Sequence, residues 1–85
     1  MKLTILYFAR LREAIGASRE EVAVPADVAD VAALRRWLIA RGEPFASALG
    51  GGGPVRAAVD QVIAADGVAL RDGAEVAFFP PVTGG

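Results

Sequence analysis

The residues best suited to chemistry stand at the end of the printed sequence, where Gly84 and Gly85 follow a Pro80-Pro81 pair. Two glycines leave the terminal carboxylate without a neighbouring side chain, and glycine accepts backbone angles that other residues avoid. The prolines fix their own backbone angles and favour extended residues before them, so segment 80–85 is expected to project as a thin tail. A frayed terminus is the alternative, because disorder concentrates at chain ends. The pattern favours a protein whose reactive group is its own terminal carboxyl group.

The composition excludes the side chains that most enzymes use. The sequence contains no Cys, and therefore no thiolate nucleophile, persulfide site, disulfide or zinc–cysteine cluster. It contains no His, which is the ordinary general base near neutral pH and the commonest metal ligand. Ser18 and Ser47 are the only serines, and neither lies in a nucleophile-elbow pattern. We therefore expect no catalysis by this chain alone, no metal site and no bound cofactor.

Length and charge narrow the class of protein further. The 85 residues suffice for one domain with one core, and a hydrophobic share of 54% with a mean hydropathy of +0.43 favours a folded chain. The net charge is −1 and the nine Lys and Arg residues form no run, so we expect neither nucleic acid nor a membrane as partner. The apolar stretches are too short to span a bilayer. The first residues lack the features of a signal peptide, so a cytoplasmic location is expected.

The strands that could position the terminus follow from alternation of apolar residues and from turn residues. Residues 2–9 alternate so that Leu3, Ile5 and Tyr7 share one face, while Phe8 lies on the other. The predicted strands are residues 2–9, 19–24, 55–60 and 75–79, with short extended pieces in residues 61–70 around an Asp66-Gly67 turn.

The clearest helix covers residues 31–41. Asp30 is the expected N-cap, and Gly42 the expected C-terminal stop. Apolar residues recur at i, i+3 and i+7 from Val31, so Arg35 is expected to point away from the apolar stripe.

Two further segments complete the pattern. Residues 10–16 read as one or two helical turns closed by glycine. Residues 43–54 are expected to form a loop, with room for one turn around Phe45, Ala48 and Leu49. The run of four glycines at 50–53 lacks the Gly-Lys-Ser/Thr ending of a phosphate-binding loop, so we interpret it as a flexible connector.

This order of elements predicts an α+β domain in which one main helix covers one face of the sheet. A chain of this length has no second helical layer for the other face. Apolar residues there must be exposed or must contact a partner. Phe8 and Phe79 are such residues, since Phe79 directly follows the inward-facing Phe78.

Three motifs together resemble the small subunit of molybdopterin synthase: YFARLRE at residues 7–13, AVDQ at 58–61 and RDGAEVAFFPPVTGG at 71–85. The resemblance implies a ubiquitin-like β-grasp fold, with a mixed sheet of four to five strands wrapped around one main helix. It further implies a β-grasp domain over residues 1–79 and a tail over residues 80–85. Asp60 departs from the family, which usually carries Asn there. Since Asp also suits turns, we expect this change to affect local geometry only.

The resemblance also implies a sulfur-carrier mechanism in molybdenum cofactor biosynthesis. In the family, an adenylyltransferase that resembles the ubiquitin-activating enzyme uses ATP to adenylate the terminal carboxylate, here Gly85. A sulfur donor then converts it to a thiocarboxylate. The large synthase subunit takes this sulfur for the cyclic pyranopterin monophosphate precursor and forms the dithiolene. Two small and two large subunits assemble.

Docking residues are implied by the same resemblance. Phe8, Ile63 and Phe79 are expected on one hydrophobic patch, with Arg12 as a polar contact at its rim, and Gly84 keeps the approach to the terminal carbonyl open. Ordinary core positions are the alternative for Phe8, Ile63 and Phe79. The expected partner-binding residues are Phe8, Arg12, Ile63, Phe79, Pro80, Pro81, Val82 and Thr83.

Other functions stay open from the sequence. A thiamine-type sulfur carrier and a ubiquitin-like modifier of lysines would both end in Gly-Gly, although the ending FFPPVTGG favours molybdopterin. A binding module with an inert tail is the remaining alternative. Removal of Gly85 would separate this last class from the others.

Overall fold

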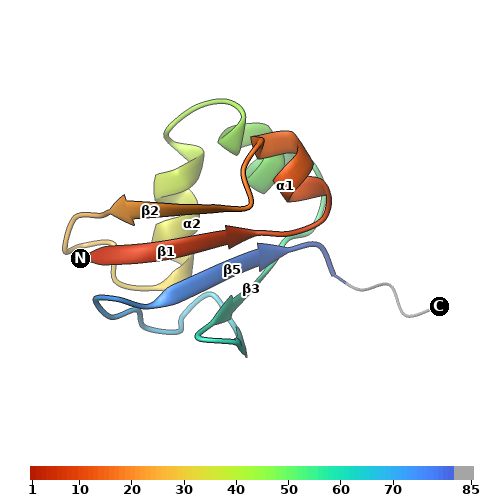
Figure 1. Cartoon of the computed structure of the whole chain (residues 1–85). Helices are drawn as coiled ribbons and strands as arrows, with labels where there is room; N and C mark the ends of the chain where they lie inside the picture. The colour runs from red at the N-terminus through yellow and green to blue at the C-terminus, as the bar shows by residue number, and fades with distance from the viewer. Residues whose placement is uncertain (82–85) are drawn as a thin grey trace.

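The structure is a computed structural model that describes residues 1–81. It contains a five-stranded sheet in the order β2-β1-β5-β3-β4, with β1 parallel to β5 and the other neighbours antiparallel. Helix α2 crosses one face of this sheet (Figure 1). The predicted α+β class and mixed sheet are confirmed. The elements are β1 (Lys2–Tyr7), α1 (Arg10–Ile15), β2 (Arg19–Ala23), α2 (Val31–Ile39), the π-helical turn η1 (Ala46–Gly51), β3 (Arg56–Val59), β4 (Val62–Ala64) and β5 (Glu75–Phe79).

The core lies between α2 and the two central strands. Ile5 and Tyr7 of β1 pair in register with Val76 and Phe78 of β5, and all four side chains are buried. The apolar stripe of α2 packs onto them, as its spacing predicts. Burial of each large side chain contributes roughly 1.5–3 kcal/mol, so this layer supplies much of the stability of the fold.

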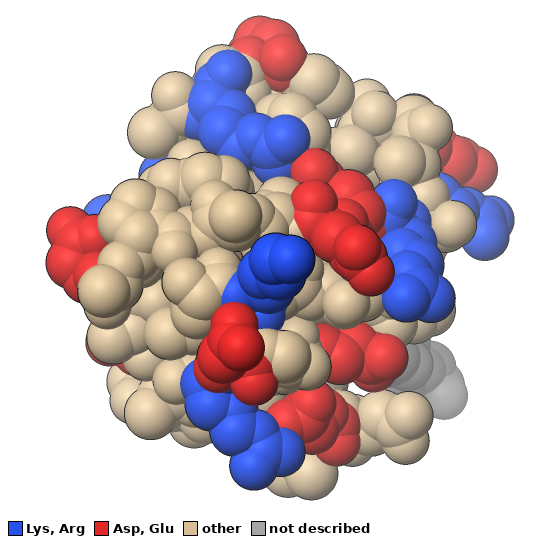
Figure 2. Space-filling model, turned by 60° about the vertical axis from the view of Figure 1, so that its left-hand side comes forward, with Lys and Arg blue, Asp and Glu red and all other residues tan. Residues whose placement is uncertain are grey.

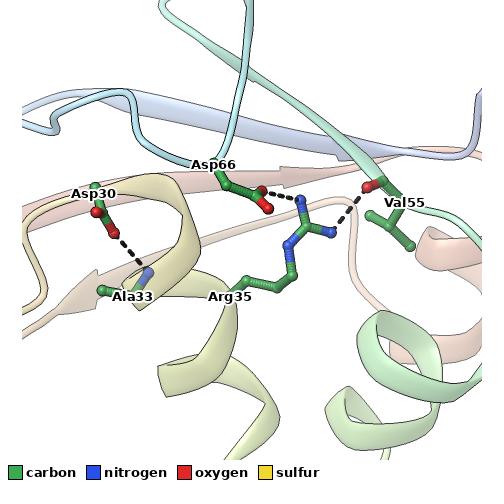
Figure 3. Close-up of polar contacts among 5 residues, drawn as sticks. All are labelled: Asp30, Ala33, Arg35, Val55 and Asp66. Atoms are coloured by element: carbon green, nitrogen blue, oxygen red, sulfur yellow. Dashed lines mark hydrogen bonds and ion pairs between the residues drawn. The ribbon is translucent and has the colours of Figure 1, made fainter.

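Helix α2 begins as predicted and ends earlier. The Asp30 carboxylate accepts a hydrogen bond from Ala33 N at 2.8 Å, which confirms the N-cap (Figure 3). The helix was predicted to reach Arg41, which is wrong by two residues. Arg41 N and Gly42 N bond to carbonyls three residues back, at 3.1 Å each, so the last turn tightens beyond Ile39.

The predicted solvent-facing position of Arg35 is also wrong. Its guanidinium lies 5.5 Å from the centroid of the buried Phe78 ring. It donates a hydrogen bond to Val55 O at 2.9 Å and contacts the Asp66 carboxylate at 3.4 Å (Figure 3). The long apolar stem lets Arg35 cover the core while its charged head reaches the surface. The side chain thereby ties α2 to the start of β3 and to the turn before Gly67.

The interpretation of 50–53 as a flexible connector is wrong for its first two glycines. Gly50 and Gly51 belong to η1, whose Ala48 and Leu49 are buried against the core. An added β-carbon on Gly50 would lie 3.2 Å from Ile39 Cδ1. The burial of two apolar residues therefore orders the turn in spite of its glycines.

The β3–β4 hairpin turns at Asp60 and Gln61, both with positive φ (49° and 70°). Asp60 Oδ1 accepts from Glu75 N at 3.0 Å, and Asp60 N donates to Glu75 O at 2.8 Å. Asp tolerates this left-handed conformation better than most residues, which confirms that residue 60 organises a turn.

Within residues 1–81, the helices are all too short or too polar to cross a membrane.

Candidate functional site

The outer face of the sheet, opposite α2, carries an apolar surface built by strand register. Leu6 pairs with Ala77, Ala77 with Ala58, and Ala58 with Ile63, so these four residues form one row across four strands. We call this row together with Phe8 and Phe79 the outer-face patch. Figure 1 shows that α2 covers the other side of the sheet.

The three predicted docking residues all belong to this patch. Ile63 is 59% exposed and Phe8 is 47% exposed, whereas Phe79 is half-buried. The core alternative is wrong for Ile63, because a core side chain would be shielded. Phe79 lies on the face opposite Phe78, as alternation requires. The structure therefore brings these residues to one face, and their docking role stays a prediction.

The corner after β1 presents Phe8. Phe8 N donates to Phe78 O at 3.1 Å, and Phe8 O accepts from Leu11 N at 3.1 Å. Ala9, between these contacts, has φ 53° and ψ −129°, a conformation that favours glycine. The buried Leu11 anchors α1 behind it. Sequence reasoning missed this strained residue, because an alanine gives no sign of a positive φ.

The chain leaves the sheet beside Phe8. Strand β5 ends at Phe79, and the half-buried Pro80 and Pro81 follow. Since β1 and β5 are parallel, both finish at the same end of the sheet, which we call the exit end (Tyr7 and Phe79). Helix α1, which carries the exposed Arg12, begins there and contacts β5. The predicted residues Val82, Thr83, Gly84 and Gly85 lie outside the described residues.

A polar cluster joins Tyr7, Glu20 and Arg41 on the helix side of the sheet. The Tyr7 hydroxyl donates to Glu20 Oε2 at 2.7 Å, and the Arg41 guanidinium meets both carboxylate oxygens at 3.1 Å. That guanidinium also stacks 4.3 Å from the Phe45 ring centroid and 5.5 Å from that of Trp37. Burial, followed by the hydrogen bond and charge of Glu20, raises the pKa of Tyr7 well above its ordinary value. Tyr7 therefore stays protonated and holds β1, β2 and the end of α2 together.

Charged side chains of both signs are interspersed on the surface. Figure 2 shows acidic and basic residues side by side across one face of the molecule. No group of three or more potential metal-ligating side chains occurs within the part of the chain that the structure describes.

Comparison with known proteins gives consistent matches. The ThiS family matches residues 5–85. The molybdopterin synthase sulfur carrier subunit of Escherichia coli (strain K12) is 46% identical over 83 residues, covering 98% of this chain and 99% of that protein. The putative molybdopterin converting factor subunit 1 of Pyrococcus furiosus is similar with a TM-score of 0.78 at 30% identity, over 96% of this chain and 99% of that one.

A second solved structure, the small archaeal modifier protein 1 of Haloferax volcanii, has a TM-score of 0.77 at 30% identity, with 100% of both chains covered. These neighbours share the ubiquitin-like β-grasp fold, as the resemblance in the sequence implies. On the match that runs from residue 5 to residue 85, this chain belongs to the ThiS family.

Proposed function

We propose that this chain is the sulfur carrier subunit of a molybdopterin synthase. The observation that carries the proposal is the 46% identity, over nearly all of both chains, to a protein of that name. The outer-face patch supports it, because an uncovered apolar surface beside the chain exit suits a protein that delivers its terminus to partners.

The chemistry takes place at the carbonyl carbon of Gly85. A carboxylate is a poor electrophile, so a separate adenylyltransferase first joins a carboxylate oxygen to the α-phosphate of ATP and releases pyrophosphate. Hydrosulfide from a sulfur donor then attacks the carbonyl carbon, the bond from that carbon to the AMP oxygen breaks, and AMP leaves. The resulting thiocarboxylate gives its sulfur to the cyclic pyranopterin monophosphate precursor in the large subunit, and water restores the carboxylate of Gly85. Two such transfers complete the dithiolene. The chain itself carries the sulfur at its terminus and positions that terminus.

The outer-face patch is the docking surface for the large subunit in this proposal. Buried aromatic side chains commonly dominate interface energies, which suits Phe8 and Phe79. Arg12 adds a charged contact at the rim. Pro80, Pro81, Val82 and Thr83 lead the terminus into the active site of the partner, in an assembly of two small and two large subunits.

Mass spectrometry tests the proposal directly. The chain is incubated with the activating enzyme, ATP and a sulfur source. Replacement of one oxygen by sulfur is expected to add about 16 Da at the residue that the Gly-Gly motif selects. A variant that lacks Gly85 is the matched control and is expected to gain nothing. Absence of the mass gain in the full chain, with an activating enzyme proven on another carrier, would contradict the proposal.

Protein modification is the second candidate, because a small archaeal modifier protein shares 30% identity with this chain over its full length. A modifier ends in an amide bond to a lysine of another protein, whereas a carrier ends in a thiocarboxylate. Recovery of this chain joined to protein lysines in cells would favour the modifier. A thiamine-type carrier would gain the same sulfur but would not restore molybdopterin synthesis.

A further inference from the structure

The sheet has two edges, β2 and β4, and they differ in composition. An edge strand presents backbone N–H and C=O groups that another strand can bind, and proteins commonly guard such edges with charged side chains. Strand β2 carries Arg19, Glu20 and Glu21 among its five residues. Strand β4 carries no charged residue, and its Val62 and Ile63 are both exposed. The β2 edge is therefore guarded by charge and the β4 edge is not.

The hydrogen bonds of β3 show which backbone groups of β4 face the edge. Along a strand that lies between two antiparallel neighbours, successive residues bond alternately to one neighbour and to the other. Asp60, directly after β3, donates from its N–H to Glu75 O at 2.8 Å, so the even-numbered residues of β3 bond to β5. Its odd-numbered residues bond to β4. Ile63 pairs with the even-numbered Ala58, so its N–H and C=O point away from β3.

These two groups of Ile63 are accessible to another strand. Within residues 1–81, neither takes part in a backbone hydrogen bond of a turn, loop or cap. The carboxylates on either side of β4 in the chain both have a guanidinium partner. Asp60 lies 3.2 Å from Arg71, and Asp66 lies 3.4 Å from Arg35. An extended apolar segment can therefore approach Ile63 without meeting an unpaired carboxylate.

We propose that the large subunit adds an extended strand to β4 at Ile63, an inference that rests on the proposed function. Strand addition gains affinity from main-chain hydrogen bonds and specificity from the adjacent side chains. The Ile63 side chain already belongs to the outer-face patch, so the added strand continues that docking surface around the edge of the sheet. Ile63 N–H donates to a carbonyl of the partner, and Ile63 C=O accepts from an N–H of the partner. The partner strand is apolar where it lies beside Ile63.

Proline separates the backbone contact from the side-chain contact. Ile63→Ala shortens the side chain and keeps the N–H, whereas Ile63→Pro also removes the N–H and places a ring at the edge. Proline is tolerated in an edge strand where the N–H faces solvent. Ala23→Pro is the matched control at the guarded edge. The neighbouring Val24 N bonds to Met1 O across β1, so Ala23 N points away from the sheet.

Isothermal titration calorimetry with the large subunit measures the affinities. Ile63→Pro is expected to bind about 10-fold more weakly than Ile63→Ala, since it loses one main-chain hydrogen bond and hinders the other. Ala23→Pro is expected to bind as wild type. Circular dichroism and thermal unfolding check that each variant is folded.

Amide hydrogen exchange of wild type tests the same contact without a substitution. In the free chain, the N–H of Ile63 is expected to exchange fast, whereas that of Val62, which bonds to β3, is protected. Binding of the large subunit is expected to slow exchange at Ile63 by at least about 10-fold. The N–H of Ala23 is expected to exchange fast in both states.

Two outcomes would overturn the inference alone: equal affinities of folded Ile63→Pro and Ile63→Ala, or fast exchange at Ile63 in the complex. Sedimentation of the free chain tests a second copy as the occupant. A dimer that Ile63→Pro abolishes, with the affinity for the large subunit unchanged, would assign the edge to that copy and overturn the inference as well. Failure of wild type to bind the large subunit would overturn the proposed function itself, and this inference with it.

Discussion

Tyr7 is the residue whose ionisation the fold opposes most. It is buried in the core, and its hydroxyl bonds to Glu20, whose charge disfavours a second negative charge beside it. Because the pKa of Tyr7 is raised in the folded chain, the native state keeps a proton that the unfolded chain loses above pH 10. The stabilisation that Tyr7 gives to the folded state is therefore fully present below pH 10. It is lost as the pH rises above 10.

Tyr7→Phe is expected to remove this dependence. In wild type, loss of the Tyr7 proton in the unfolded chain should lower the free energy of unfolding by about 1.4 kcal/mol for each pH unit above 10. Tyr7→Phe should lack this slope and should cost about 1–2 kcal/mol at neutral pH, since the hydrogen bond to Glu20 is lost. Urea titrations between pH 7 and pH 11 measure both values.

Tyr7 is the only tyrosine, so the ultraviolet absorbance of phenolate reports its titration directly. Ionisation of the folded chain near pH 10, with the native fold retained, would contradict the role given to burial and to Glu20.

The start of α2 is an element boundary that the sequence predicted correctly. Asp30 satisfies the free N–H of Ala33. Asp30→Ala is expected to lower the free energy of unfolding by about 0.5–2 kcal/mol. For a domain of this size, each kcal/mol corresponds to about 4–8 °C in Tm.

Calorimetry of three variants tests the cap. Asp30→Ser keeps a capping oxygen and is expected to stay near wild type. Asp27→Ala removes an exposed carboxylate outside the helix and should change the stability by less than about 0.5 kcal/mol. Equal losses for Asp30→Ala and Asp30→Ser would show that the capping bond is not the cause.

Within residues 1–81, α2 covers one face of the sheet, and the opposite face carries the outer-face patch. Ile63 and Val62 are neighbours on β4, 59% and 68% exposed, yet they pair with Ala58 and Val59 and so point to opposite faces. They form a matched pair of substitution sites for the docking surface.

Ile63→Ser is expected to weaken binding to the large subunit, by about 2 kcal/mol or roughly 30-fold in Kd if Ile63 acts as a hot spot. Val62→Ser should bind as wild type, and both variants should be as stable as wild type within about 0.5 kcal/mol. Isothermal titration calorimetry measures the affinities. Equal affinities of the two variants for the large subunit would show that Ile63 is not part of the interface.

We propose that the activating enzyme binds the same outer-face patch as the large subunit, which has a consequence for the assembly. The activating enzyme and the large subunit are expected to exclude each other, so loading with sulfur alternates with delivery. A pull-down on the immobilised activating enzyme should release this chain as the large subunit is added. A stable ternary complex would contradict the shared patch.

Several features were readable from local sequence because they depend on neighbours in the chain. Alternation assigned the inner faces of β1 and β5, and the Asp30 cap marked the start of α2. The absence of Cys and His, together with the motif at residues 71–85, is the basis for the predicted chemistry at the terminal carboxyl group, which stays a prediction. These signals are short-range: strand periodicity, capping and side-chain reactivity do not need the rest of the fold.

Only the tertiary structure decided the features that depend on distant segments. Arg35 lies against Phe78, η1 is ordered in spite of its glycines, and Ala9 is held at positive φ by contacts on both sides. The parallel pairing of β1 with β5 brings Phe8 beside Phe79 and places Lys2 at the far end. A local pattern cannot specify these arrangements, because each results from packing and hydrogen bonds between residues that are far apart in the sequence.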